Sequence, residues 1–275
     1  MPFINVRDLK MYYEIRGKGP RLLVISGTGG DLRRLPNIFE MPIAKHFEIL
    51  AYDQRGLGQT SRPDIPYTMV DYADDANALL GAVGWDRCLV TGISFGGMIA
   101  QEFALRYPHR VERLVLACTS SGGTGGASYP LHELAGLPLE DYVRRILQLR
   151  DIRRHAVWRE ANPAQFQTLF DETLAGLRVG ADEPGRQMGA RRQLEARARH
   201  DTYDRLPKLQ MPVYICGGLY DAIAKPANLK AMQEQIPKSR LELFEGGHLF
   251  YVQDPRAFDR MTAFLRGNLN GKFKG

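Results

Sequence analysis

The chain has 275 residues, of which 44% are hydrophobic and 25% charged, a composition typical of one large globular domain with an insertion. Its net charge of +6 is dispersed, because residues 124–207 hold thirteen Arg, no Lys and twelve Asp or Glu, and this disfavours a nucleic-acid partner. The N-terminus lacks the apolar core of a signal peptide, and no apolar run is long enough to span a membrane. We therefore expect a cytoplasmic protein without a membrane partner.

The first half of the chain alternates apolar, strand-like runs with helical patterns. We predict strands at 3–6, 10–16, 21–26, 46–52, 87–90 and 111–117, and helices at 34–45, 70–83 and 98–105. The continuous apolar run at 21–26 is typical of a strand that is covered on both faces. Strands that alternate with helices predict a mostly parallel sheet with helices on both faces, which is an α/β fold.

This alternation stops after Cys118, where a run rich in Gly, Ser and Thr begins. Up to residue 205 we find only helical patterns, at 140–149, 164–177 and 186–199. The alternation returns with strands at 211–218 and 239–244 and helices at 225–236 and 255–268. We therefore predict a core domain of residues 1–123 and 208–275, with a helical cap of residues 124–207 inserted between the sixth and seventh strands.

The three cysteines, Cys88, Cys118 and Cys216, lie in or beside apolar strand-like runs. An odd number without close pairs argues against a disulfide framework or a zinc site. We expect buried free thiols in a reducing compartment. No spacing of His, Cys or Asp is typical of a metal site either, so we expect no metal and no other cofactor.

A serine flanked by glycines lies where a predicted strand meets a predicted helix. Gly92-Ile-Ser94-Phe-Gly96 matches the G-x-S-x-G nucleophile elbow. Glycines allow neighbouring chains to approach closely, while the sharp turn exposes the serine hydroxyl. The helix N-terminus also places partial positive charge where an oxyanion would form. The alternative interpretation is an N-cap serine after a glycine turn.

A serine nucleophile needs a general base, and that base needs an acid to orient it. His248 follows the last predicted strand after two glycines, which let the loop return over the sheet. Asp221 follows the preceding strand, at the carboxyl end where ligand sites of open α/β sheets gather. An Asx turn or a helix N-cap is the alternative role for Asp221. We predict that Ser94, His248 and Asp221 form a catalytic triad.

An oxyanion needs two hydrogen-bond donors. We predict the backbone N–H groups of Phe95, which follows the nucleophile, and of Thr28, in the Gly-rich loop after the 21–26 strand. A simple tight turn is the alternative for this loop. Its spacing does not match a phosphate-binding loop.

Taken together, these motifs resemble the α/β-hydrolase superfamily over residues 3–268. The resemblance rests on the Ser26-Gly-Thr-Gly-Gly30 loop, the Asp53-Gln-Arg-Gly-Leu-Gly-Gln-Thr60 turn, the Gly92-Ile-Ser-Phe-Gly-Gly97 elbow, the Asp221 turn and Gly246-Gly-His248. It implies an α/β-hydrolase fold with a helical cap, and a cofactor-free serine hydrolase that uses the triad and oxyanion donors given above. Two positions depart from the family pattern, since Ser26 and Leu57 stand where histidine is common.

The segment from the elbow to Gln101 is similar to enol-lactonases of the 3-oxoadipate type and to small esterases. We therefore expect a small-molecule carboxylic ester or lactone as substrate, and a monomer or homodimer. Two alternatives stay open. One is a carbon–carbon bond hydrolase or a haloperoxidase- or perhydrolase-like enzyme with the same triad; the other is a binding protein of this fold with little turnover. A serine at position 94 disfavours epoxide hydrolases and haloalkane dehalogenases, which carry aspartate there.

We expect the substrate to contact the core loops and the cap. The candidate contacts are Gly27, Phe95, Tyr129, Trp158, Phe166 and Leu249. Arg150, Arg153 and Arg154 are candidates for contact with an acidic substrate. The alternative for each is an aromatic residue that packs a core or an arginine on a solvated face. For Asp53 and Arg55 we expect a structural role in the loop after the 46–52 strand.

Overall fold

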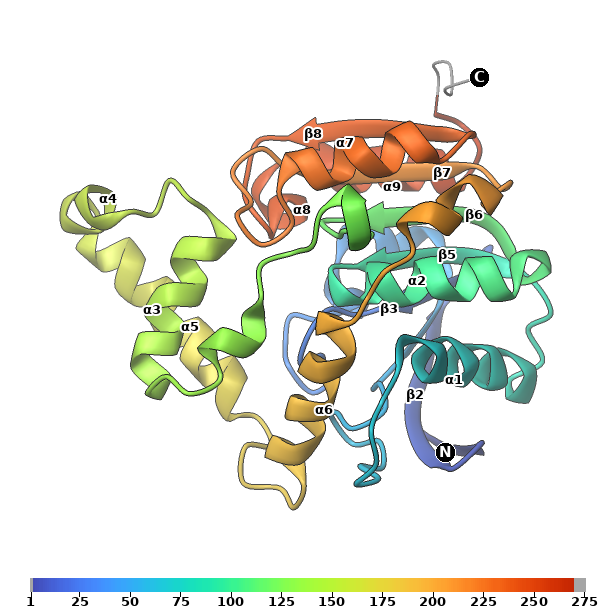
Figure 1. Ribbon diagram of the computed structural model, residues 1–275, viewed down its shortest axis with the longest axis horizontal. Coiled ribbons are helices and arrows are strands. Elements are labelled where there is room, and N and C mark those ends of the chain that lie inside the picture. Colours follow the sequence, from blue (N-terminus) through green and yellow to red (C-terminus); the bar gives the residue numbers. More distant parts are fainter. Residues whose placement is uncertain (1, 270–275) are drawn as a thin grey trace.

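A computed structural model describes residues 2–269 of the chain, and its centre is a single eight-stranded sheet (Figure 1). The strands are β1 (Phe3–Val6), β2 (Leu9–Gly17), β3 (Arg21–Ile25), β4 (Glu48–Tyr52), β5 (Cys88–Ile93), β6 (Val111–Ala117), β7 (Val213–Gly218) and β8 (Ser239–Phe244). Their order is β1-β2-β4-β3-β5-β6-β7-β8. β2 pairs antiparallel with β1 and β4, and the other pairs are parallel. The predicted α/β fold is confirmed.

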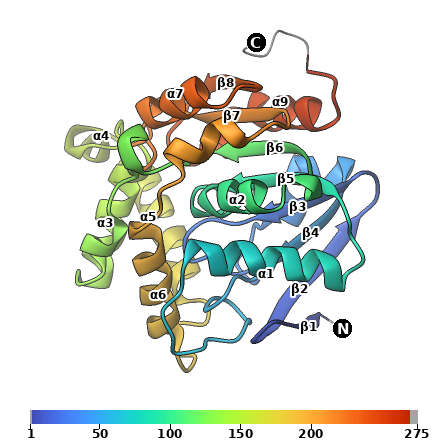
Figure 2. The same cartoon turned by 45° about the vertical axis from the view of Figure 1, so that its right-hand side comes forward.

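Helices cover both faces of this sheet (Figure 2). One face carries α1 (Met69–Ala82), α2 (Phe95–Arg106) and α7 (Pro226–Gln235), and the other carries α8 (Phe250–Gln253) and α9 (Arg256–Leu265). Successive side chains of a strand point to opposite faces of the sheet. In β3, Leu23 packs in the core beneath α1 and α2, and Leu22 packs in the core beneath α9. All three cysteines are buried and free.

The segment that we predict as one helix at 34–45 forms two short 3-10 helices instead, η1 (Ile38–Glu40) and η2 (Pro42–His46). Pro42 cannot donate the hydrogen bond that a continuous helix would need. It also forces the preceding residue, Met41, into an extended conformation, with φ −78° and ψ 152°. The prediction of a single helix was wrong because proline ends the first turn and begins the second.

Between β6 and β7 the chain is helical and lies together at one end of the sheet (Figure 1). The elements are η4 (Gly123–Gly125), η5 (Leu131–Leu134), α3 (Leu139–Arg150), α4 (Ala156–Ala161), α5 (Pro163–Arg178), α6 (Arg186–Ala198) and η6 (Tyr203–Lys208). We call α3 to α6 the cap helices. α3 and α5 share a small apolar core of their own, formed by Val143, Leu147 and Phe170. The predicted domain bounds stay a prediction, and residues 1 and 270–275 of the predicted core lie outside the described residues.

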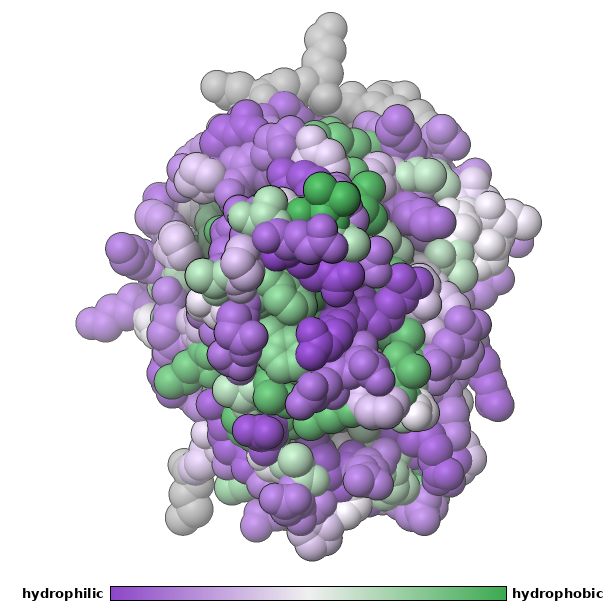
Figure 3. Space-filling view, turned by 90° about the vertical axis from the view of Figure 1, so that its left-hand side faces the viewer, coloured by the Kyte–Doolittle hydropathy of each residue, from purple (hydrophilic) through white to green (hydrophobic). Residues whose placement is uncertain are grey.

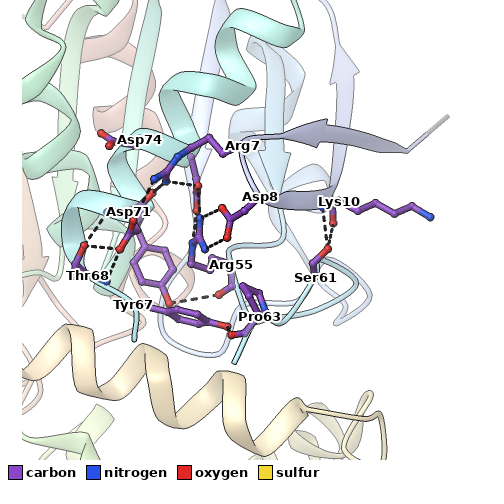
Figure 4. Close-up of polar contacts among 12 residues, drawn as sticks. Arg7, Asp8, Lys10, Arg55, Ser61, Pro63, Tyr67, Thr68, Asp71 and Asp74 are labelled. Carbon is purple, nitrogen blue, oxygen red and sulfur yellow. Dashed lines mark hydrogen bonds and ion pairs between the residues drawn. The ribbon is translucent and has the colours of Figure 1, made fainter. Parts of the chain in front are cut away.

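A buried ionic network ties the loop after β4 to α1 and to the β1–β2 turn (Figure 4). The Arg55 guanidinium donates to both carboxylate oxygens of Asp8, at 2.8 and 2.7 Å, and to both of Asp75, at 2.9 and 2.8 Å. Arg7 donates to Asp75 as well, at 2.7 Å. In the same loop, the Asp53 carboxylate accepts hydrogen bonds from the N–H groups of Leu32 and Gln59, each at 2.8 Å. These contacts agree with the structural role expected for Arg55 and Asp53.

Candidate active site

Ser94 lies in the turn between β5 and α2, with φ 56° and ψ −117°. This backbone conformation is unfavourable for a residue with a side chain, so the surroundings must hold it. A Cβ on Gly96 would lie 2.0 Å from the carbonyl oxygen of Ile25, and one on Gly92 would lie 2.4 Å from that of Gly96. Only glycine fits at either position, so the two glycines of the motif let β3, β5 and α2 meet at the turn.

Hydrogen bonds from the end of β6 fix the strained turn. The Ser94 N–H donates to the Ala117 carbonyl at 2.8 Å. The Thr119 hydroxyl donates to the Ser94 carbonyl at 2.7 Å. Both backbone groups of the serine are therefore held by the neighbouring strand and the residues after it, and its hydroxyl projects toward the loops after β7 and β8.

The structure brings Ser94, His248 and Asp221 into one hydrogen-bonded triad. His248 Nε2 lies 2.9 Å from Ser94 Oγ, and His248 Nδ1 lies 2.7 Å from Asp221 Oδ2. The other carboxylate oxygen of Asp221 accepts the N–H groups of Ile223 and Ala224, at 2.7 and 3.0 Å. All three side chains are buried, with 8%, 8% and 3% of Ser94, His248 and Asp221 exposed. In this geometry a proton can pass from Oγ to Nε2 while Nδ1–H donates to the carboxylate.

The C-terminal end of α3 holds the two loops that carry His248 and Asp221. The His248 N–H donates to the Arg150 carbonyl at 2.5 Å. Around Asp221, the Ala222 N–H donates to Leu149 and the Ile152 N–H donates to Tyr220, each at 3.0 Å. A cap helix thus positions the base and the acid through its backbone, a contact that side-chain patterns in the sequence do not reveal.

The two predicted oxyanion donors lie near the serine hydroxyl. Phe95 is the first residue of α2, so its N–H has no acceptor within the helix. The N–H of Thr28 donates to no residue within 2–269, and Thr28 lines the same cavity as Ser94. A Cβ built on Gly27 would lie 3.3 Å from the Ser94 Cβ, so the loop after β3 closely approaches the nucleophile.

A chain of side-chain amides connects this loop to the cap. The Gly29 N–H donates to Gln193 of α6 at 2.8 Å. Gln193 donates in turn to Gln54 at 3.1 Å, and Gln54 donates to the Ser26 carbonyl at 2.6 Å. We call Gln193 and Gln54 the amide relay. It holds the loop by hydrogen bonds at Ser26 and at Gly29. The sequence does not reveal this contact, because the two glutamines are 139 residues apart.

A cavity of about 230 Å³ opens on the triad. Its lining residues are Gly27, Thr28, Gly29, Gly30, Arg34, Ile93, Ser94, Leu131, Tyr142, Ile146, Arg150, Ile223, His248, Leu249 and Tyr251. Gly27 and Leu249 therefore lie where the sequence places them. A second cavity of about 220 Å³ adjoins the first, because the two share five lining residues, and its remaining walls are largely apolar.

The predicted aromatic walls lie elsewhere. The Phe95 side chain is fully buried in the core, edge-on to Tyr72 at 5.1 Å between ring centroids. Phe166 packs on Phe170 within the cap, and Trp158 lies on the short helix α4. Tyr129 packs behind cavity residues rather than lining the cavity. None of these four side chains lines the cavity around Ser94.

These features define a class of protein. A serine at a strand–helix turn, linked through histidine to aspartate at the carboxyl ends of a mostly parallel sheet, is the arrangement of serine-nucleophile α/β hydrolases. A family model described as alpha/beta hydrolase fold matches residues 20–255. The chain belongs to this family.

Individual relatives support a hydrolase. The chain is 29% identical to a poly(3-hydroxyalkanoate) depolymerase from Ectopseudomonas oleovorans, over 84% of the chain and 78% of that protein. It is 25% identical to 3-oxoadipate enol-lactonase 2 from Acinetobacter baylyi, over 97% of both. The crystal structure of the enol-lactonase from Burkholderia xenovorans superposes with a TM-score of 0.77 at 21% identity, covering 97% of the chain and 100% of that structure. This last likeness bears on the fold alone.

Two further properties concern the part of the chain that the structure describes. None of its helices has the length and apolar character needed to cross a bilayer. Nor do three or more of its His, Cys, Asp or Glu side chains gather in a group that could hold a metal ion.

Proposed function

We propose that this protein hydrolyses a carboxylic ester or lactone of a small molecule through an acyl-enzyme on Ser94. The observation that carries the proposal is the hydrogen-bonded chain from Ser94 through His248 to Asp221, which opens on a cavity of about 230 Å³. A cavity of this size favours a small substrate. The name of the enol-lactonase relative favours a lactone or ester bond.

In the proposed reaction Ser94 Oγ attacks the substrate carbonyl while His248 Nε2 takes its proton. Asp221 holds the imidazole tautomer and stabilises the imidazolium that forms. The N–H groups of Phe95 and Thr28 bind the oxyanion of the tetrahedral intermediate. His248 then gives its proton to the leaving oxygen, the carbonyl re-forms, and the acyl group stays on Ser94. A water molecule, deprotonated by His248, releases the acid by the same steps.

Pre-steady-state hydrolysis of aryl esters and small lactones tests this proposal. We expect a burst of about one product per wild-type enzyme, followed by steady turnover, because acylation and deacylation are separate steps. Ser94→Ala should lose both phases, with kcat lower by about 10⁴-fold or more. An unchanged rate in Ser94→Ala would show that another group is the nucleophile. A wild-type burst without turnover would favour a binding protein instead.

A further inference from the structure

Two arginine side chains line the cavity that contains Ser94 and His248. Arg34 comes from the loop after β3, and Arg150 is the last residue of α3. A Cβ built on Gly29 would lie 3.8 Å from Arg34 Nη1, so this guanidinium lies beside the proposed oxyanion loop. Among the residues that line the cavity there is no Asp or Glu. The walls of this cavity therefore carry two positive side chains and no acidic one.

The Arg34 guanidinium has no polar partner within residues 2–269. Its Nε is buried without a hydrogen bond, and the side chain forms no ion pair. Burial lowers the pKa of Arg34, and the nearby charge of Arg186 lowers it further. The negative charge of Asp31 raises the pKa of Arg34 in part. The Asp31 carboxylate is itself bound by the Arg33 guanidinium, at 2.9 and 2.7 Å. No acid within residues 2–269 forms an ion pair with Arg34.

Arg150, like Arg34, has no acidic partner in the part of the chain that the structure describes. Its carbonyl is anchored by the His248 N–H, while its guanidinium makes no hydrogen bond or ion pair with any described residue. Burial lowers the pKa of Arg150, and only the phenols of Tyr142 and Tyr251 act to raise it. Arg153, three residues on, is by contrast paired with Asp151 at 2.8 Å and stacked over an aromatic ring.

Each of these guanidinium groups loses hydration on burial without gaining an acidic partner, and this cost falls when an anion binds beside it. We propose that the substrate is an ester or lactone that carries an ionised carboxylate, and that Arg34 and Arg150 bind this carboxylate. The inference rests on the proposed function for the reaction itself. A guanidinium fork matches the two oxygens of a carboxylate, so the pair selects charge and also orients the ester carbonyl.

The adjoining cavity indicates what separates the carboxylate from the reacting carbonyl. Arg34 lines both cavities, and most walls of the second are apolar, including Leu32, Ile38 and Phe258. Its one acidic wall, Asp31, is paired with Arg33. A short aliphatic chain fits the apolar walls. The chemical class is thus an aliphatic half-ester, or a lactone with a carboxylate side chain.

A matched pair of substrates tests the inference. A mono-aryl glutarate carries the carboxylate, and the aryl methyl diester of the same acid lacks the charge. We expect wild type to prefer the mono-aryl glutarate in kcat/KM. Arg34→Met and Arg150→Met should each lower the preference by about 10- to 100-fold, because a charged hydrogen-bond partner is lost while an apolar stem remains. Arg178→Met, at an exposed position on α5, is the matched control and should keep the wild-type preference.

Thermal unfolding of each variant checks that the fold is kept. If wild type hydrolyses both esters in a Ser94-dependent manner and the Arg variants keep its preference, the inference is wrong while the proposed function stands. If no ester or lactone is cleaved, the proposed function fails, and calorimetry of glutarate monomethyl ester with Ser94→Ala decides the inference. Binding that Arg150→Met abolishes would support it, and no binding would overturn it.

Discussion

Two groups of arginines in this molecule differ in what surrounds them: Arg55 in the loop after β4, and Arg34 and Arg150 at the cavity around Ser94. Arg55, which is 1% exposed, donates four hydrogen bonds to Asp8 and Asp75 (Figure 4). Arg34 and Arg150 lie against the cavity and donate none to the described residues. A buried charge with complete partners fixes the structure around it, whereas Arg34 and Arg150 leave their donor groups free for a ligand in the cavity.

The pKa directions separate the same two groups. Burial alone would lower the pKa of Arg55, but its hydrogen bonds to Asp8 and Asp75 raise it above the ordinary value. For Arg34 and Arg150 burial lowers the pKa and no such bonds oppose it. On the face of the molecule that carries the cap, hydrophilic side chains surround apolar ones that are visible near the middle (Figure 3).

The largest effect should come from Arg55→Met. Removing this guanidinium leaves Asp75 buried with Arg7 as its remaining ionic partner, so we expect a loss of about 3 kcal/mol or more in the free energy of unfolding. Urea denaturation measures it. Arg150→Met should change the same quantity by less than about 1 kcal/mol, because no native pair is broken. Equal destabilisation by the two substitutions would contradict the distinction between structural and ligand-binding arginines. Adding Asp75→Leu to Arg55→Met should restore part of the loss.

The role of Arg55 is easier to predict from the sequence than the roles of Arg34 and Arg150. The triad and the elbow could be predicted because each rests on local chemistry: glycines at a strand–helix turn, and a polar residue just after a buried strand. The structural role of Arg55 is expected from the family resemblance and from its position in the loop after the 46–52 strand. Arg153 pairs with Asp151, two residues before it in the sequence, and stacks over Tyr220, which only the tertiary fold brings close. That Arg150 stays unpaired likewise depends on the fold.

Other parts of the site could not be predicted for similar physical reasons. Arg34 falls in the segment predicted as a helix, whose two prolines instead produce short turns and an open loop. The aromatic residues of the cap were assigned to the cavity without knowledge of which helix face points inward. Trp158 and Phe166 lie on α4 and α5, away from the cavity, while Tyr142 of α3 lines it.

His200 is a buried base that, unlike the arginines, can lose its charge. Burial lowers the pKa of His200 to about 3, so the folded protein keeps it neutral. In the unfolded chain it binds a proton below a pKa of about 6.5, and stability is therefore lost as the pH falls through this range. At pH 5 the loss is about 2 kcal/mol relative to pH 7.

The measurement compares wild type with His200→Gln, since burial raises the pKa of Asp53 to about 6 and acts in the opposite sense. A carboxyl that binds its proton more tightly when folded stabilises the protein as the pH falls, in both proteins alike. The difference between the two unfolding free energies isolates His200, and it should shift by about 2 kcal/mol between pH 7 and pH 5. A difference that does not vary with pH would show that His200 is protonated in the folded state.

The smallest expected effect concerns the amide relay, whose groups are neutral whereas those of the Arg55 network are charged. Gln193 joins the Gly29 N–H to Gln54, so Gln193→Ala leaves the loop beside Thr28 without its support from α6. A lost buried hydrogen bond of this kind costs about 1 kcal/mol or somewhat more. If the relay positions the Thr28 N–H for the oxyanion, this cost should appear in the transition state, as a fall of about tenfold in kcat with KM nearly unchanged.

Gln165→Ala, at an exposed position of α5, is the matched control and should leave both constants at the wild-type value. Gln193→Glu extends the test, because a carboxylate can still accept the Gly29 N–H but cannot donate to Gln54. Recovery of kcat in Gln193→Glu would assign the effect to the Gly29 contact, and no recovery would assign it to the full relay. A rise in KM alone for Gln193→Ala would instead show that α6 acts on substrate binding, which would place the relay with the ligand-binding arginines rather than with the oxyanion loop.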